Sequence, residues 1–170
     1  MTALTLSTAA ASGLRADAIV VGVAKGAKGP VVALGAESVD KAYDGKLASV
    51  LETLGASGGE GEVTKLPAPS GFKAPVVLAV GLGAVPEKDS AYDADTLRRA
   101  AGAAARALAG TKRAGFALPI ADAADVGAVA EGGETYLNED LMAEIGVPSA
   151  DVMEIVDRKA AGGLSFAPLI

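Results

Sequence analysis

The segment from Pro75 to Gly81 constrains the fold more than any other part of the chain. Its centre, Val76-Val77-Leu78-Ala79-Val80, is apolar at every position. A half-exposed strand alternates apolar and polar residues, whereas a strand buried on both faces of a sheet is apolar throughout. The run therefore predicts a central strand with cover on both sides, and we expect Gly81-Leu82-Gly83 to terminate it.

Shorter strand-like and helix-like segments alternate around this run. Leu47, Val50, Leu51 and Leu54 follow the spacing of one helical face. The pattern predicts strands over residues 18–23, 30–34, 62–66 and 114–118, and helices over 46–54, from Asp93 or Asp95 to Leu108, and over 123–131. Such alternation is typical of an α/β fold, here with a mixed sheet flanked by helices on both faces and a C-terminal helical tail.

The composition excludes several classes of function. The 170 residues include neither Cys nor His, so thiolate zinc sites, cysteine nucleophiles and imidazole-dependent triads are ruled out. A net charge of −6 argues against an electrostatic nucleic-acid binder. No apolar run is long enough to cross a bilayer, and no secretory signal is evident. We expect a cytoplasmic protein that binds neither nucleic acid nor membrane and has no cofactor.

Glycines and paired carboxylates are the motifs that most often carry chemistry in such folds. Gly22 to Gly26 and Gly81 to Gly83 follow predicted strands, but neither completes a dinucleotide or P-loop motif. Tight strand-to-helix turns explain them better. Asp93 with Asp95, and Asp122 with Asp125, are explained as caps of the helices that follow. The pattern therefore nominates no catalytic or metal-binding residue.

The charge is concentrated in the last part of the chain. Residues 1–132 carry 14 acidic and 13 basic side chains, whereas residues 133–170 carry 7 acidic and 2 basic ones. We interpret the chain as an α/β domain over 1–132 followed by an acidic helical tail over 133–170. Asn138 can cap a helix over Glu139 to Ile145, and Ser149 can cap a second one that ends before Gly162.

The end of this tail is apolar and uncharged, and two interpretations of it stay open. It either docks on a partner or on the domain itself, or it is a peptide that is released or modified after Gly-Gly. A plain helix C-cap also explains the two glycines. The candidate processing or docking segment consists of Gly162, Gly163, Leu164, Ser165, Phe166, Ala167, Pro168, Leu169 and Ile170.

Residues 1 to about 132 resemble the N-terminal domain of the leucyl aminopeptidase (cytosol aminopeptidase) family. The pieces that carry the resemblance agree in order and spacing. They are Ala16-Asp17-Ala18-Ile19-Val20-Val21-Gly22-Val23, Val76 to Gly83, Leu97 to Leu108, and Val129-Ala130-Glu131-Gly132. The resemblance ends at Gly133, where the family would continue into a linker helix.

The resemblance implies a macro-domain-like fold in a non-catalytic domain that helps to assemble a hexamer from trimers. The family's catalytic domain supplies the metal ligands and the catalytic Lys and Arg. We find none of those motifs, so no site residue is carried over and we expect no enzymatic activity. We therefore expect a binding or assembly domain that self-associates or binds a protein partner. The alternative is a precursor whose body and acidic helices form a leader for a processing or peptide-modifying enzyme acting on Leu164 to Ile170.

Overall fold

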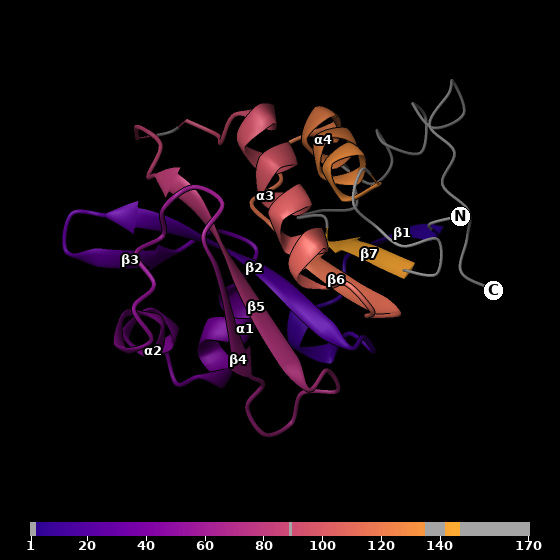
Figure 1. Cartoon of the computed structure of the whole chain (residues 1–170), viewed down its shortest axis with the longest axis horizontal. Helices are drawn as coiled ribbons and strands as arrows, with labels where there is room; N and C mark the ends of the chain where they lie inside the picture. The colour runs from indigo at the N-terminus through magenta and orange to yellow at the C-terminus, as the bar shows by residue number, and fades with distance from the viewer. Residues whose placement is uncertain (1–2, 89, 135–141, 147–170) are drawn as a thin grey trace.

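A computed structural model describes residues 3–88, 90–134 and 142–146 of the chain (Figure 1). Strands and helices alternate along most of this length. The elements are β1 (Ala3–Ser7), the 3-10 helix η1 (Ala11–Gly13), β2 (Ala18–Gly26), β3 (Gly29–Val32), α1 (Glu37–Ala42), α2 (Leu47–Thr53), β4 (Val63–Pro67), β5 (Val76–Ala84), α3 (Ala94–Ala107), β6 (Arg113–Ala117), α4 (Ala123–Glu134) and β7 (Met142–Gly146).

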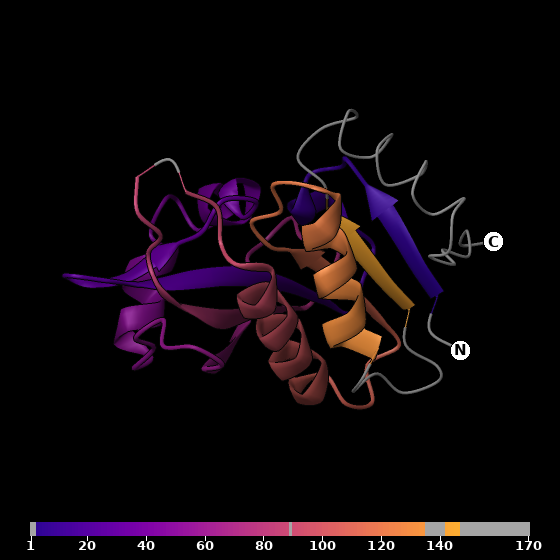
Figure 2. The ribbon, with the colours of Figure 1, turned by 90° about the horizontal axis from the view of Figure 1, so that it is seen from above.

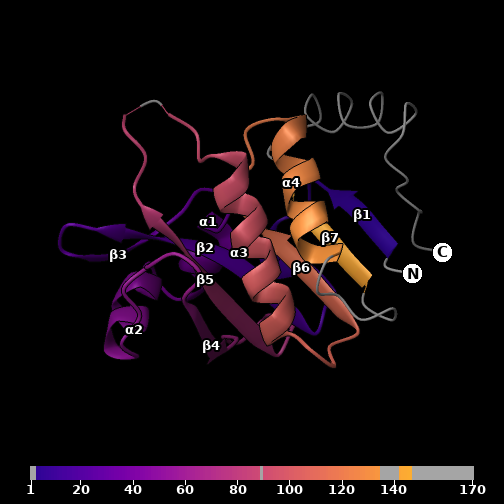
Figure 3. The same ribbon diagram turned by 45° about the horizontal axis from the view of Figure 1, so that its top comes forward.

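One mixed sheet contains all of these strands. Its order is β1-β7-β6-β2-β5-β4, and β3 pairs with β2 off this path. The neighbours from β1 to β5 are parallel, whereas β4 and β3 run antiparallel to β5 and β2. Figure 3 shows β1 and β7 at one end of the sheet and β3 and β4 at the other. The predicted mixed sheet is confirmed, and β5 is paired on both sides as the apolar run indicated.

Helices cover both faces of the sheet, as the sequence predicted. Helices α3 and α4 lie side by side on one face, and α1 lies on the other (Figure 2). Strand β2 contributes to both cores because its side chains alternate between the faces. Val20 packs in the core formed with α3 and α4, whereas Ile19 and Val21 pack in the core formed with α1 and α2.

The side chain of Asp93 caps α3 by accepting a hydrogen bond from the Asp95 N–H at 3.2 Å, as predicted.

Small residues let α3 and α4 approach each other closely. A Cβ at Gly132 would lie 2.1 Å from the carbonyl oxygen of Arg98. Only glycine fits at this contact between the two helices.

The glycines of β2 and β5 were predicted to form turns, and this prediction is wrong. Gly22 lies inside β2, and β5 continues through Gly81 and Gly83 to Ala84. Strand β5 continues because the backbone of the loop before β4 pairs with it. The Gly61 N–H donates to the Gly81 carbonyl at 3.0 Å, and the Gly81 N–H donates to the Glu62 carbonyl at 2.7 Å.

The helix predicted over Glu139 to Ile145 is also wrong where the structure describes it. Met142 to Gly146 form β7, which lies between β1 and β6 in parallel register. Ile145 faces Leu6 and Phe116 in these strands and is 1% exposed. Pairing with two strands outweighs the weak local preference for a helix. Strand β1 and helices η1 and α1 were not predicted.

Candidate functional site

A groove of about 830 Å³ lies along the edge of the sheet where the parallel strands end. Its lining segments follow these strands in the sequence, or connect β3 to α1. They include residues 9–11 after β1, 31–35, 85–88 after β5, 116–121 around the end of β6, and Gly146 at the end of β7. Ligands of open α/β sheets bind at this edge, because the loops that follow parallel strands gather there. We call this feature the carboxyl-edge groove.

The lining of the carboxyl-edge groove is mainly aliphatic. Four large apolar side chains are exposed among the described residues, and three of them line this groove. They are Leu34, Val85 and Val31, whose exposed fractions are 75%, 50% and 44%. An exposed group of apolar side chains that borders a concave site is typical of a surface that binds an apolar partner.

Gly35 shapes the wall between β3 and α1. Its φ of +94° is a left-handed conformation, and a Cβ there would lie 2.9 Å from the Leu118 carbonyl oxygen. The Gly35 N–H donates to both carboxylate oxygens of Glu37 at 3.0 Å. These contacts hold Leu34 at the rim of the groove, where its side chain is exposed.

A buried carboxylate behind the lining holds the end of the 116–121 segment. The side chain of Asp125 is 5% exposed and accepts a hydrogen bond from the Ala121 N–H at 2.8 Å. Burial raises the pKa of Asp125, and the nearby charge of Asp122 raises it further, whereas the Ala121 N–H lowers it. Asp122 caps α4 by accepting from the N–H groups of Ala124 and Asp125. The predicted capping role of Asp122 is confirmed, whereas Asp125 accepts from Ala121, which precedes the helix, and does not cap it.

The polar groups of the groove do not form an acid–base pair. The carboxylate of Glu37 accepts from the backbone of Gly35, and the Ser38 hydroxyl accepts from the Ser12 N–H at 3.3 Å. Burial raises the pKa of Tyr92. No group of three or more Asp or Glu side chains in the described part of the chain is placed to hold a metal ion. Glu37, Glu87 and Lys88 are the charged residues of the lining, and most of the rest is apolar, so the groove is suited to binding an apolar ligand.

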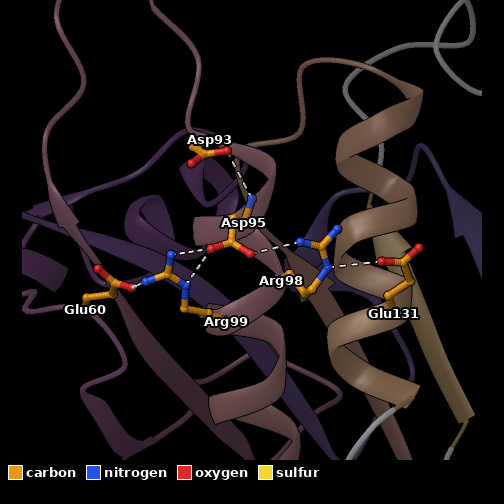
Figure 4. A network of polar contacts seen from close by, with 6 residues as sticks. All are labelled: Glu60, Asp93, Asp95, Arg98, Arg99 and Glu131. Atoms are coloured by element: carbon orange, nitrogen blue, oxygen red, sulfur yellow. Dashed lines mark hydrogen bonds and ion pairs between the residues drawn. The ribbon is translucent and has the colours of Figure 1, made fainter.

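A network of charged side chains lies apart from the groove, on the outer side of α3 and α4 (Figure 4). Asp95 pairs with both Arg98 and Arg99, which in turn reach Glu131 and Glu60. The hydrogen bond and charge of Arg99, followed by those of Arg98, hold the pKa of Asp95 below its usual value. The network joins α3 to α4 and to the loop before β4. All of its members are substantially exposed, so water and salt screen it and it adds little to stability.

The predicted segment from Gly162 to Ile170 lies outside the described residues. The two interpretations of that segment therefore stay predictions. Sequence patterns did not indicate the carboxyl-edge groove, since its lining comes from loops without apolar periodicity. The pattern places Leu34 at the end of a strand over 30–34, whereas β3 ends at Val32 and Leu34 is exposed after it.

No helix among the described residues combines the length and apolarity needed to cross a bilayer.

The sheet order, the helices on both faces and the groove at the carboxyl edge define a macrodomain-like α/β protein. An Oceanobacillus iheyensis macrodomain superposes with a TM-score of 0.68 over 92% of this chain and 90% of that one, at 13% identity. At that identity the likeness concerns the fold alone. The predicted macro-domain-like fold is thus confirmed.

The chain belongs to the cytosol aminopeptidase family through that family's N-terminal domain. The profile described as "Cytosol aminopeptidase family, N-terminal domain" matches residues 20–137. A probable cytosol aminopeptidase of Streptomyces coelicolor is 82% identical over 132 residues, which are 78% of this chain and 26% of that protein. A probable cytosol aminopeptidase of Rhodococcus opacus is 42% identical over 127 residues. The family resemblance inferred from the sequence is confirmed.

The likeness to these relatives is confined to their N-terminal part. The chain spans about a quarter of the length of the curated relatives that it matches. A solved structure titled "Bottromycin maturation enzyme BotP in complex with Mn" shows the same limit. It is 28% identical, with a TM-score of 0.56, over 88% of this chain and 29% of that one.

Proposed function

We propose that this domain is a non-catalytic assembly module, and that its carboxyl-edge groove binds an apolar surface of a second copy of the chain. One observation carries the proposal. Three of the four large apolar side chains exposed in the described part of the chain, Val31, Leu34 and Val85, gather at this one groove. Singly exposed apolar residues are ordinary on protein surfaces, but a cluster around a concavity is typical of an interface.

The expected energy of such a contact is modest. Full burial of one Val or Leu side chain stabilises by about 1.5–3 kcal/mol, and these three are already partly covered. The two partners also lose translational and rotational freedom when they associate, and this cost offsets several kcal/mol of the gain from burial. The groove alone therefore supports a weak, concentration-dependent association. A tighter assembly would need contacts beyond the groove.

The family gives independent support to assembly rather than chemistry. The matched region is the N-terminal domain, and the resemblance noted from the sequence implies an assembly role for that domain. The titratable residues of the groove are Glu37, Glu87, Lys88 and Tyr92, and no hydrogen bond or ion pair in the described part of the chain joins two of them, as an acid–base pair would require. Both considerations support binding.

Sedimentation velocity over a range of protein concentrations tests the proposal. We expect the native chain to associate reversibly and Leu34→Glu to weaken that association by about tenfold or more, because it places a charge in an apolar contact. Leu54→Glu is the matched control, since Leu54 is 54% exposed, directly follows α2 and is not a lining residue of the groove. A native chain that stays monomeric at high concentration, or equal effects of the two variants, would contradict the proposal.

A further inference from the structure

A second hollow lies at the opposite edge of the sheet, where the parallel strands begin. It has a volume of about 530 Å³ and is lined by Arg15, Ala16, Asp17, Lys73 and Arg113. These residues come from three separate segments, which precede β2, precede β5 and begin β6. We call this feature the cationic hollow, because three of its five lining residues carry a positive charge.

The positive charges of the cationic hollow outnumber its one carboxylate, Asp17. Arg15, Lys73 and Arg113 form no ion pair with a carboxylate among the described residues. The guanidinium of Arg113 donates instead to the backbone carbonyl of Arg15, at 3.3 Å. This contact holds the two arginines together although they are 98 positions apart in the sequence.

Asp17 is the acidic residue of the hollow, and its carboxylate binds backbone N–H groups. One of its carboxylate oxygens, Oδ2, accepts from the backbone N–H groups of Lys112 and Arg113, at 3.2 and 3.0 Å. The Asp17 N–H also donates to the Arg113 carbonyl at 2.9 Å. Asp17 therefore fixes the start of β6 beside the segment that precedes β2, and it positions Arg113 at the hollow.

Convergence of unpaired cations is costly unless an anion is bound, because like charges repel when they share a concave surface. This cost is notable in a chain whose net charge is −6. Guanidinium groups present several donors in one plane and match the oxygens of phosphate or carboxylate groups. The hollow is shallow and open, which suits a small anionic group, whereas an extended polyanion would need a longer positive surface.

We propose that the cationic hollow binds a small ligand through a phosphate or diphosphate group, held by Arg15, Lys73 and Arg113. The site shares no lining residue with the carboxyl-edge groove, although Leu14 of the groove directly precedes Arg15 of the hollow. It therefore stands independently of the assembly proposal.

Isothermal titration calorimetry of the full chain with inorganic pyrophosphate at low ionic strength tests this site. We expect the double variant R15Q/R113Q to weaken binding by about tenfold or more. The matched control is K25Q/K28Q, which removes the same charge from the exposed hairpin of β2 and β3 at the opposite edge. This control should leave the affinity within about twofold, because distant exposed charges are screened by salt.

Asp17→Asn gives a prediction of the opposite sign. Asparagine keeps a side-chain oxygen for the two backbone N–H groups but removes the negative charge, so pyrophosphate should bind more tightly. A purely structural role of Asp17 would not increase the affinity. Thermal unfolding followed by circular dichroism checks that each variant is folded.

Three results would overturn the proposal. They are the absence of pyrophosphate binding at millimolar concentration, an equal loss in R15Q/R113Q and K25Q/K28Q, and displacement of pyrophosphate by a short oligoglutamate peptide at equal or lower concentration. The last result would assign the hollow to an acidic protein partner.

Discussion

Gly81 tests whether the sheet depends on close backbone contact at a single residue. A Cβ there would lie 1.7 Å from the carbonyl oxygen of Gly59, which is itself fixed in the loop before β4. The obstacle is backbone rather than a flexible side chain, so the loop or the strand must move. We expect Gly81→Ala to lower the free energy of unfolding by about 1–3 kcal/mol, measured by urea denaturation.

Gly127 supplies the control for this substitution. It lies inside α4, and no atom beyond its own helix and chain neighbours lies within 4 Å of a Cβ built on it. Alanine favours a helix over glycine by about 0.5–1 kcal/mol, so Gly127→Ala should stabilise the protein. Equal effects of the two alanine substitutions would show that the close approach at Gly81 is not the cause.

Asp125 makes stability depend on pH. Because burial raises its folded-state pKa above the unfolded value, the charged form is disfavoured in the folded protein. The free energy of unfolding of the native chain should rise, relative to that of Asp125→Asn, as pH falls from 7 through the folded pKa. It should level off below the ordinary Asp value. Urea denaturation at a series of pH values measures this difference.

Asp125→Ala separates the charge from the hydrogen bond. This variant also loses the acceptor for the Ala121 N–H, so it should be less stable than Asp125→Asn by about 1 kcal/mol at pH 7. A difference between the native chain and Asp125→Asn that does not vary with pH would contradict the assigned pKa shift.

At the scale of elements, β7 is the last strand of the sheet in the described part of the chain, and it lies beyond the predicted domain boundary at residue 132. Ile145 is 1% exposed and packs in the core with Phe116 and Leu6. Its truncation to Ala should cost about 2–5 kcal/mol, because it leaves a cavity between two paired strands. Leu54→Ala, at an exposed position directly after α2, should change stability by no more than about 0.5 kcal/mol. Urea denaturation compares the two variants.

The outcome bears on the predicted boundary at residue 132. A large effect of Ile145→Ala would place β7 in the same cooperative unit as the rest of the sheet. An effect as small as that of Leu54→Ala would show that the domain is stable without β7, which would support a separate tail from residue 133.

Elements whose own residues carry the signal could be predicted from the sequence. The continuous run of β5 and the one-faced spacing of α2 needed no knowledge of neighbours, and Asp93 marked the start of α3. Strand β7 could not be predicted in this way. The five residues of β7 include one acidic residue, Glu144, and lack a run of β-branched residues. Their strand conformation depends on β1 and β6 on either side.

The strand position of Gly81 and the two candidate sites could not be predicted from the sequence either, because each depends on contacts between distant segments. Gly81 is a strand residue because the loop from Gly58 to Glu62 crosses it, and that contact is invisible in a local pattern. The carboxyl-edge groove and the cationic hollow are each formed by short segments far apart in the sequence. Their residue types, Leu34 or Arg15 for example, are ordinary for a surface until the topology brings them together.

At the scale of the whole molecule, the two candidate sites lie at opposite edges of one sheet. Strand β6 carries Arg113 of the hollow and Phe116 of the groove three residues apart, so about 10 Å separates these two lining residues. This distance is comparable to the Debye length of about 8 Å at physiological salt, so a charge placed at one site is partly screened at the other. The sites share no lining residue. We therefore expect them to act independently.

A cycle of variants tests this independence at 0.15 M salt, an ionic strength of about the physiological value. Leu34→Glu should weaken self-association but leave the affinity for pyrophosphate within about twofold, and R15Q/R113Q should do the reverse. In the combined variant, the two free-energy changes should add within about 0.5 kcal/mol. Sedimentation velocity and calorimetry provide the two readouts. If Leu34→Glu also reduced pyrophosphate binding, self-association and the anion site would be coupled, because a second copy of the chain would then have to complete the cationic hollow.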